Sequence, residues 1–130
     1  MRHRVLIVVV ASILPACGGS DADADRFCEL LEELDGLDTR GLPPDQALVV
    51  MEQERDRLEE VSNVAPDEIR ADVQLFAGGV LDLVGLQIAA GGDESQIDQA
   101  DADALAEGVF TAEFDAASTN VIEWREANCD

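Results

Sequence analysis

Apolar residues recur at intervals of three and four along most of the chain, which is the spacing of one face of an α-helix. The first such stretch starts near Arg26, and the second follows the helix-breaking segment 41–45. The apolar positions are Phe27, Leu30, Leu31, Leu34 and Leu37 in the first stretch, and Ala47, Leu48, Met51, Leu58 and Val61 in the second. The pattern predicts two amphipathic helices, with Asp25 as a possible cap of the first and a charged, solvated outer face on the second.

The most apolar stretch opens at Ala65–Arg70, with a proline and acidic residues where a helix starts. One side of this third predicted helix carries Ile69, Val73, Phe76, Val80, Leu83 and Val84, which we expect in the core. The opposite side carries Ala71, Gly78 and Gly85, small residues that allow close approach of another backbone. Two interpretations stay open: a central helix packed on both sides within its domain, or a partly exposed face that docks a partner or an apolar ligand. A membrane span is disfavoured because Asp82 would lie in mid-bilayer.

A last helix is predicted after the break at Gly91-Gly92 and an acidic loop or short helix at residues 93–103. Its apolar positions are Phe110, Phe114, Ala117, Val121 and Trp124. The predicted fold is therefore all-α, a small up-down bundle of about four helices in one domain, residues 26–130. In such a bundle the start of the first helix and the end of the last lie at the same end.

The first 16 residues follow another pattern: arginines at the start, an apolar middle, and a small-residue exit. This is the layout of a secretory signal, and the apolar run is shorter than the roughly 20 residues of a transmembrane helix. The end of the run, Leu14-Pro15-Ala16-Cys17, resembles the lipobox of bacterial lipoproteins. The resemblance implies cleavage before Cys17, diacylation of Cys17 with chains such as palmitate, and anchoring on the extracytoplasmic face of the cell membrane. The alternative is an ordinary secretory signal cut near Ala16.

Residues 17–25 are small and acidic, as expected for a flexible tether between the lipid and the domain. If Cys17 is acylated, two cysteines are left over, Cys28 and Cys129. We expect them to form a disulfide in an oxidising compartment, and a structural bond is favoured over a redox pair because the chain has no Cys-x-x-Cys motif.

Charge and composition exclude several functions. The formal net charge is −21 for the whole chain, and without the signal six arginines face 29 acidic residues, a charge of −23. Nucleic-acid binding is therefore not expected, and polar partners should be cationic. The mature chain has no Lys, Tyr or His, so we expect no catalytic residue and no imidazole-based metal site.

Acidic residues suggest two cation sites, and neither is convincing. Asp21, Asp23, Asp25 and Glu32 imitate a calcium loop, but Arg26 occupies the position that requires glycine. The acidic segment 93–103 has no fixed ligand spacing. We predict no metal site and no cofactor.

Three further features loosely resemble small exported helical proteins of high-GC bacteria: Phe27-Cys28, the opening 65–70, and an aromatic residue before a terminal cysteine. The resemblance carries no activity. The sequence favours a lipid-anchored interaction or accessory protein of the cell envelope that binds a partner protein and is not an enzyme. The alternative is an extracytoplasmic binding module for a small apolar ligand or a cation.

Overall fold

The computed structural model describes residues 21–130, and this part of the chain folds as five α-helices packed as a bundle. They are α1 (Asp21–Asp35), α2 (Pro44–Val64), α3 (Arg70–Ala89), α4 (Gln99–Val109) and α5 (Ala112–Asn128). Two short 3-10 helices, η1 (Asp67–Ile69) and η2 (Glu94–Gln96), precede α3 and α4. The all-α prediction is confirmed.

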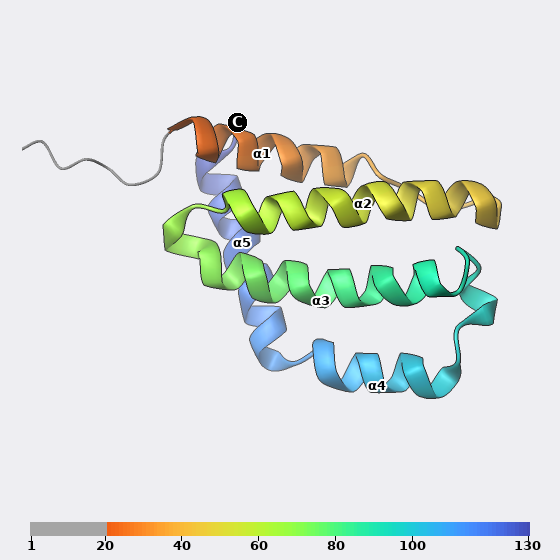
Figure 1. Ribbon diagram of the computed structural model, residues 1–130. Coiled ribbons are helices and arrows are strands. Elements are labelled where there is room, and N and C mark those ends of the chain that lie inside the picture. Colours follow the sequence, from red (N-terminus) through yellow and green to blue (C-terminus); the bar gives the residue numbers. More distant parts are fainter. Residues whose placement is uncertain (1–20) are drawn as a thin grey trace, which may run out of the picture.

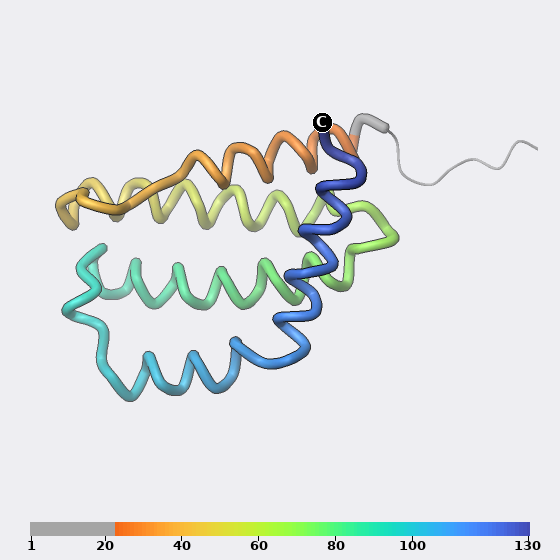
Figure 2. Tube along the Cα trace, turned by 180° about the vertical axis from the view of Figure 1, so that it is seen from behind, coloured from red at the N-terminus to blue at the C-terminus, as the bar shows by residue number. Residues whose placement is uncertain are grey.

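Four of the helices form a layer, and the fifth crosses it (Figure 1). Helices α1 to α4 lie side by side, and each runs opposite to its predecessor (Figure 1). Helix α5 crosses one side of this layer and ends beside the start of α1 (Figures 1 and 2). On the other side of the layer, no helix from residues 21–130 covers α2 and α3 (Figure 1).

Two groups of buried side chains hold the helices together. The first lies among α1, α2, η1, α3 and α5, and consists of Phe27, Leu30, Leu31, Val61, Ala65, Ile69, Val73 and Val121. The second joins α2 to α3 and consists of Ala47, Met51, Leu58, Ala77 and Val84. Fully burying an aliphatic or phenyl side chain contributes about 1.5–3 kcal/mol, so these groups are the main source of stability. Most of the predicted core positions of the first two helices belong to them.

The predicted disulfide is present. Cys28 of α1 and Cys129, which follows α5, are bonded with their Cα atoms 5.6 Å apart and 101 positions apart in sequence. Trp124 packs edge-on against Phe27 next to this bond, with ring centroids 5.4 Å apart, and its indole N–H donates to Glu68 Oε1. Trp124, an apolar position of the predicted last helix, therefore packs beside the bridge.

The number of helices differs from the prediction of about four. The predicted last helix is α5. For the acidic segment 93–103 a loop or a short helix was predicted, and α4 begins inside it and continues to Val109. Asp98 caps it by accepting a hydrogen bond from the amide of Ala100 at 2.9 Å. Because α4 buries no residue, its sequence lacks the apolar stripe by which a packed helix is recognised.

The predicted boundary of the tether is also corrected. We expected residues 17–25 to be flexible, with the domain starting at Arg26, but α1 already begins at Asp21. Alanine is the best helix former, and acidic residues in the first turn complement the positive end of the helix dipole. The alternating Ala and Asp residues therefore extend the helix, and Asp25 lies within it and is not its cap. Residues 17–20 lie outside the described residues.

The C-terminal end of α3 is fixed against the start of α2. Gly91 and Gly92 have φ of 71° and 78°, a region that favours glycine, so the helix stops where the sequence predicted. A Cβ atom on Gly92 would clash with the carbonyl oxygen of Pro44. This close backbone contact sets the register of α3 on α2.

Candidate functional site

The most unusual surface of the protein is one side of α3. Six residues follow this side at helical spacing, and we call them the open face: Ala71, Leu75, Gly78, Asp82, Gly85 and Ala89. All are exposed except Gly78, which is half-buried, and 46% of Leu75 is accessible to solvent. A Cβ atom built on Gly78 or Gly85 would meet nothing within 4 Å. No other side chain among the described residues covers these two positions.

The remaining sides of α3 are packed. Ala77 and Val84 belong to the buried group shared with α2. Gly79, one position after Gly78, faces α4 and α5, since a Cβ there would be 2.6 Å from both Phe114 and Val109. Of the two interpretations of the small residues, packing on both sides within the domain is therefore wrong for the side that carries Gly78 and Gly85.

Helix α3 is unusually apolar for a helix that has one side exposed to solvent. By length and composition, the stretch Asp67–Ala89 is the one segment of the described chain that could span a membrane, with a mean hydropathy of 1.3 over 18 residues, of which 17% are buried. A surface helix normally turns a polar face to water. Spanning is disfavoured because it would bring Asp82 and the charged helix α2, which packs along α3, into hydrocarbon.

The end of α4 adds apolar surface close to α3. Phe110 is 53% exposed and packs edge-on against Phe114, with centroids 5.6 Å apart, and Phe114 stacks on Phe76 of α3 at 5.8 Å. Phe110 was predicted as a core position of the last helix, but it lies in the turn between α4 and α5. This aromatic cluster connects α3 to both helices.

Residues 71–124, which include the open face, carry no positive charge. None of the residues from Ala71 to Trp124 is Arg, Lys or His, while eleven are acidic. These acidic residues are Asp72, Asp82, Asp93, Glu94, Asp98, Asp101, Asp103, Glu107, Glu113, Asp115 and Glu123. Among the described residues, every ion pair is made by one of six arginines, which lie between positions 26 and 70 and at position 125. No ion pair involves any of the eleven acidic residues named above.

The arginines serve the structure. Arg26 of α1 bonds to Glu60 of α2 at 2.9 Å, and Arg57 of α2 reaches back to Glu33 of α1 at 2.5 Å. Hydrogen bonds from Arg26 to Glu29 and then Glu60 hold the pKa of Arg26 above its ordinary value. These pairs fasten α1 to α2.

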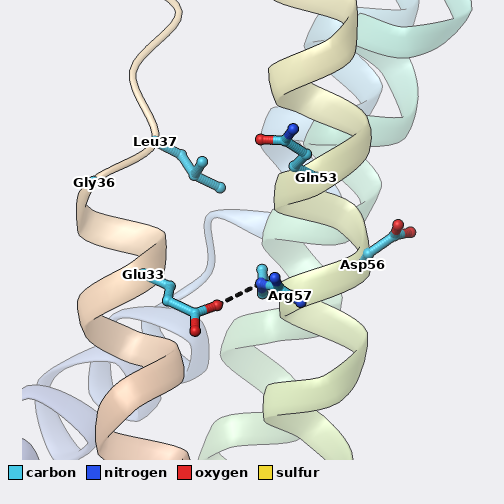
Figure 3. A pocket seen from close by; sticks show the side chains of 6 residues that line it. All are labelled: Glu33, Gly36, Leu37, Gln53, Asp56 and Arg57. Atoms are coloured by element: carbon cyan, nitrogen blue, oxygen red, sulfur yellow. Dashed lines mark ion pairs between the residues drawn. The ribbon is translucent and has the colours of Figure 1, made fainter.

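One hollow lies beside this network. It has a volume of about 380 Å³ and lies between the end of α1 and the middle of α2, with Glu33 and Leu37 on the side of α1 and Gln53 and Arg57 on the side of α2 (Figure 3). Because Glu33 neutralises Arg57, the hollow has no free cation for an anionic ligand. Its charged lining also makes it a poor site for an apolar molecule.

A second hollow, of about 660 Å³, lies between α1 and α5 beside the disulfide. Its lining includes Glu29, Glu32 and Arg125, and Arg125 pairs with Asp35 at 2.6 Å. Hydrogen bonding to Asp35 raises the pKa of Arg125. This hollow is also open to solvent and lined largely by charged side chains, so neither hollow resembles an enclosed apolar ligand site.

The two candidate cation sites are not assembled in the described residues. The backbone of 21–32 is helical, so it cannot wrap around an ion as a calcium loop does. In the acidic segment, Asp93 bonds to Ser95, Asp98 caps α4, and Asp103 accepts from Gln99. Within residues 21–130, no group of three potential ligands is arranged to hold a metal.

The predicted modification site Cys17 lies outside the described residues, whereas Cys28 and Cys129 are brought together as expected. Sequence reasoning identified the small-residue side of α3 but missed the charge pattern around it. The signal was available: a count of basic residues along the chain shows that they stop at Arg70 and resume at Arg125.

Comparison with protein-family models, curated proteins and solved structures gave no match to this chain.

Proposed function

We propose that this protein is a lipid-anchored interaction or accessory protein of the cell envelope, held on the extracytoplasmic face of the membrane by acylated Cys17, and that it acts by binding a partner protein. The observation that carries the binding role is the open face of α3, an apolar helix surface that the described chain leaves uncovered. Apolar faces of this kind are typical of protein-binding sites.

The export part of the proposal rests on the signal-like residues 1–16, on the lipobox-like tetrapeptide, and on the disulfide. A disulfide persists in oxidising compartments and is rare in reducing ones. The absence of Lys, Tyr and His from residues 17–130 supports binding without catalysis, since His is the commonest general acid or base. The alternative of an apolar-ligand or cation module has no supporting observation among the described residues.

Membrane fractionation of host cells tests the anchor. A Cys17→Ser variant should move from the membrane to the soluble fraction and lose incorporation of labelled palmitate, while a Ser20→Ala variant should behave like the parent. Unchanged membrane retention of Cys17→Ser would refute anchoring through this residue.

Cross-linking in intact cells tests the binding role. The protein should co-purify with a partner that an unrelated lipoprotein does not capture, and a Leu75→Ser variant should lose that partner. An Ile122→Ser variant is the matched control, since Ile122 is a 54% exposed apolar residue on α5. Loss of the partner in neither variant, or in both, would contradict a binding site on α3.

A further inference from the structure

We infer that the open face of α3 binds a cationic amphipathic helix, whose apolar side lies on α3 and whose Lys and Arg side chains reach the carboxylates on either side. This inference rests on the proposed binding role and names the chemistry of the partner. Two independent properties of the surface lead to it, its apolar centre and the sign of the surrounding charge.

The apolar centre of this surface is long and narrow, so it suits an elongated binding partner. The open face extends along α3 from Ala71 to Ala89, and its neighbouring positions are also apolar, because between Leu75 and Ala89 the polar side chains are only Asp82 and Gln87. Burial of apolar surface contributes about 25 cal/mol per Å². Packed helices lie 8–10 Å apart, and the bare backbone at Gly78 and Gly85 leaves room for a helix at this distance. A helix laid along α3 therefore fits the surface.

The acidic residues lie where the flanks of such a helix would be. Helix α2 carries Glu52, Asp56 and Glu59 at helical spacing, all exposed, on the side opposite its buried residues. Arg55 adjoins this stripe and pairs with Asp56 at 3.4 Å, so the stripe keeps a net negative charge. The acidic stripe of α2 and the open face of α3 both lie away from the buried residues that join these two helices. Helix α5 crosses one side of the layer, and no helix of residues 21–130 covers α2 and α3 on the other (Figures 1 and 2).

The other flank is α4, and it carries the same sign of charge. Asp101, Asp103 and Glu107 are exposed on α4, and Asp82 lies in the middle of the open face itself. In the described chain, no ion pair engages Asp82, Glu52, Glu59 or the carboxylates of α4. Complementary charge steers association and excludes partners of the wrong sign.

The sign of the charge decides among possible occupants. A second copy of this chain would bring the same carboxylates against themselves, and an anionic lipid surface would be repelled for the same reason. A neutral apolar helix would cover Leu75, but it would also bury the carboxylate of Asp82 without a counter-charge. Burying an unpaired charge costs free energy. A helix with one apolar and one cationic face satisfies both the apolar centre and the acidic flanks.

Titration of the purified full chain with synthetic peptides tests the inference. The probe is a fluorescently labelled 18-residue peptide of Leu, Ala and Lys with one apolar and one cationic face. The first control peptide has the same composition in scrambled order, and the second has Glu in place of Lys. We expect the helical cationic peptide to bind about tenfold or more tightly than the scrambled one, with no measurable binding of the acidic one.

Variants locate the binding site. Leu75→Ser and Asp82→Asn should each raise Kd by about fivefold or more, as central interface residues do. The matched controls Ile122→Ser and Asp115→Asn, which alter an exposed apolar and an exposed acidic residue of α5, should keep Kd within about twofold. Equal effects of the two pairs, or equal binding of the scrambled peptide, would show diffuse charge attraction and overturn the inference. The inference would also be overturned if the chain formed a dimer and the Leu75→Ser variant did not.

Failure of this inference can be told apart from failure of the proposed function. If the peptide does not bind but cross-linking captures a partner that Leu75→Ser loses, α3 is the binding surface and its partner is not a cationic helix. If the cross-linked partner is also unaffected by Leu75→Ser, the proposed site on α3 fails as well.

Discussion

The ring of Phe114 lies directly against the backbone of Gly79, so a Cβ atom there would come within 2.6 Å of ring carbon Cε2. Helix α5 therefore reaches α3 where α3 has no side chain. The preceding residue, Gly78, has open space at the same position. Two adjacent glycines of one helix thus have opposite surroundings, one packed and one bare.

This contrast predicts opposite effects of the same substitution. Gly79→Ala should destabilise the protein by about 1–3 kcal/mol, because Phe114 and Val109 must move to admit the methyl group. Gly78→Ala should stabilise it by about 0.5–1 kcal/mol, since alanine restricts the unfolded chain and meets no obstacle in the helix. Urea unfolding of both variants measures this difference, and equal midpoints would contradict the packing of α5 on α3 described above.

Loss of the disulfide should lower stability strongly. The bond between Cys28 and Cys129 closes a loop of 101 positions, and closing a loop of about 100 residues stabilises by about 4–5 kcal/mol in the chain-entropy model. A Cys28→Ser variant should melt roughly 15–25 °C below the parent. Reducing agent should lower the Tm of the parent in the same way, and an equal Tm would remove the bond from the account of stability.

Glu54 should make stability depend on pH in the opposite sense to a salt-bridged carboxylate. Burial raises the pKa of Glu54 above its ordinary 4.5, so the folded protein keeps this proton to a higher pH than the unfolded chain does. Stability is therefore lost as pH rises from the ordinary value through the raised one. Glu54→Gln should be more stable than the parent at pH 7, and the difference should vanish below about pH 4.

A matched variant separates this effect from net charge. Glu52→Gln removes the same charge from an exposed position of the same helix, so it reports only on the general repulsion among carboxylates. Urea midpoints at both pH values should show a larger gain for Glu54→Gln at pH 7. An equal gain in the two variants would contradict the effect of burial.

Added salt should raise the melting temperature. Residues 21–130 contain all 29 acidic residues and six arginines, and such an excess of one sign destabilises the compact state by repulsion. Salt also weakens the exposed ion pairs, but each of these contributes only about 0.2–1 kcal/mol. We expect Tm to rise between 0.01 and 0.5 M NaCl, as screening shortens the Debye length from about 30 Å to below 8 Å. A falling Tm would show that the arginine network outweighs the repulsion.

The local features of the fold could be read from the sequence because they depend on neighbouring residues. The three- and four-residue spacing of apolar positions identified α1, α2, α3 and α5, and Gly91-Gly92 and Pro66 marked ends of α3. The pairing of Cys28 with Cys129 followed from the small number of cysteines. The choice between a loop and a short helix at 93–103 stayed open, and the end of α4 at Val109 was not predicted, because this helix buries no residue and carries no apolar stripe. The start of α1 was placed too late because acidic, alanine-rich segments suit both tethers and first turns.

The sequence by itself determined that α3 is helical and apolar on more than one side, that small residues line one of those sides, and that no basic residue lies between Arg70 and Arg125. Only the tertiary structure decided which of the sides is covered. Periodicity reports the polarity of a helix face but not its neighbour, and when both faces are apolar, either can be core. The side on which α5 crosses the layer, set by the packing of Phe114 on Gly79 and by the disulfide at the far end of α5, makes one face core and leaves the other in contact with water.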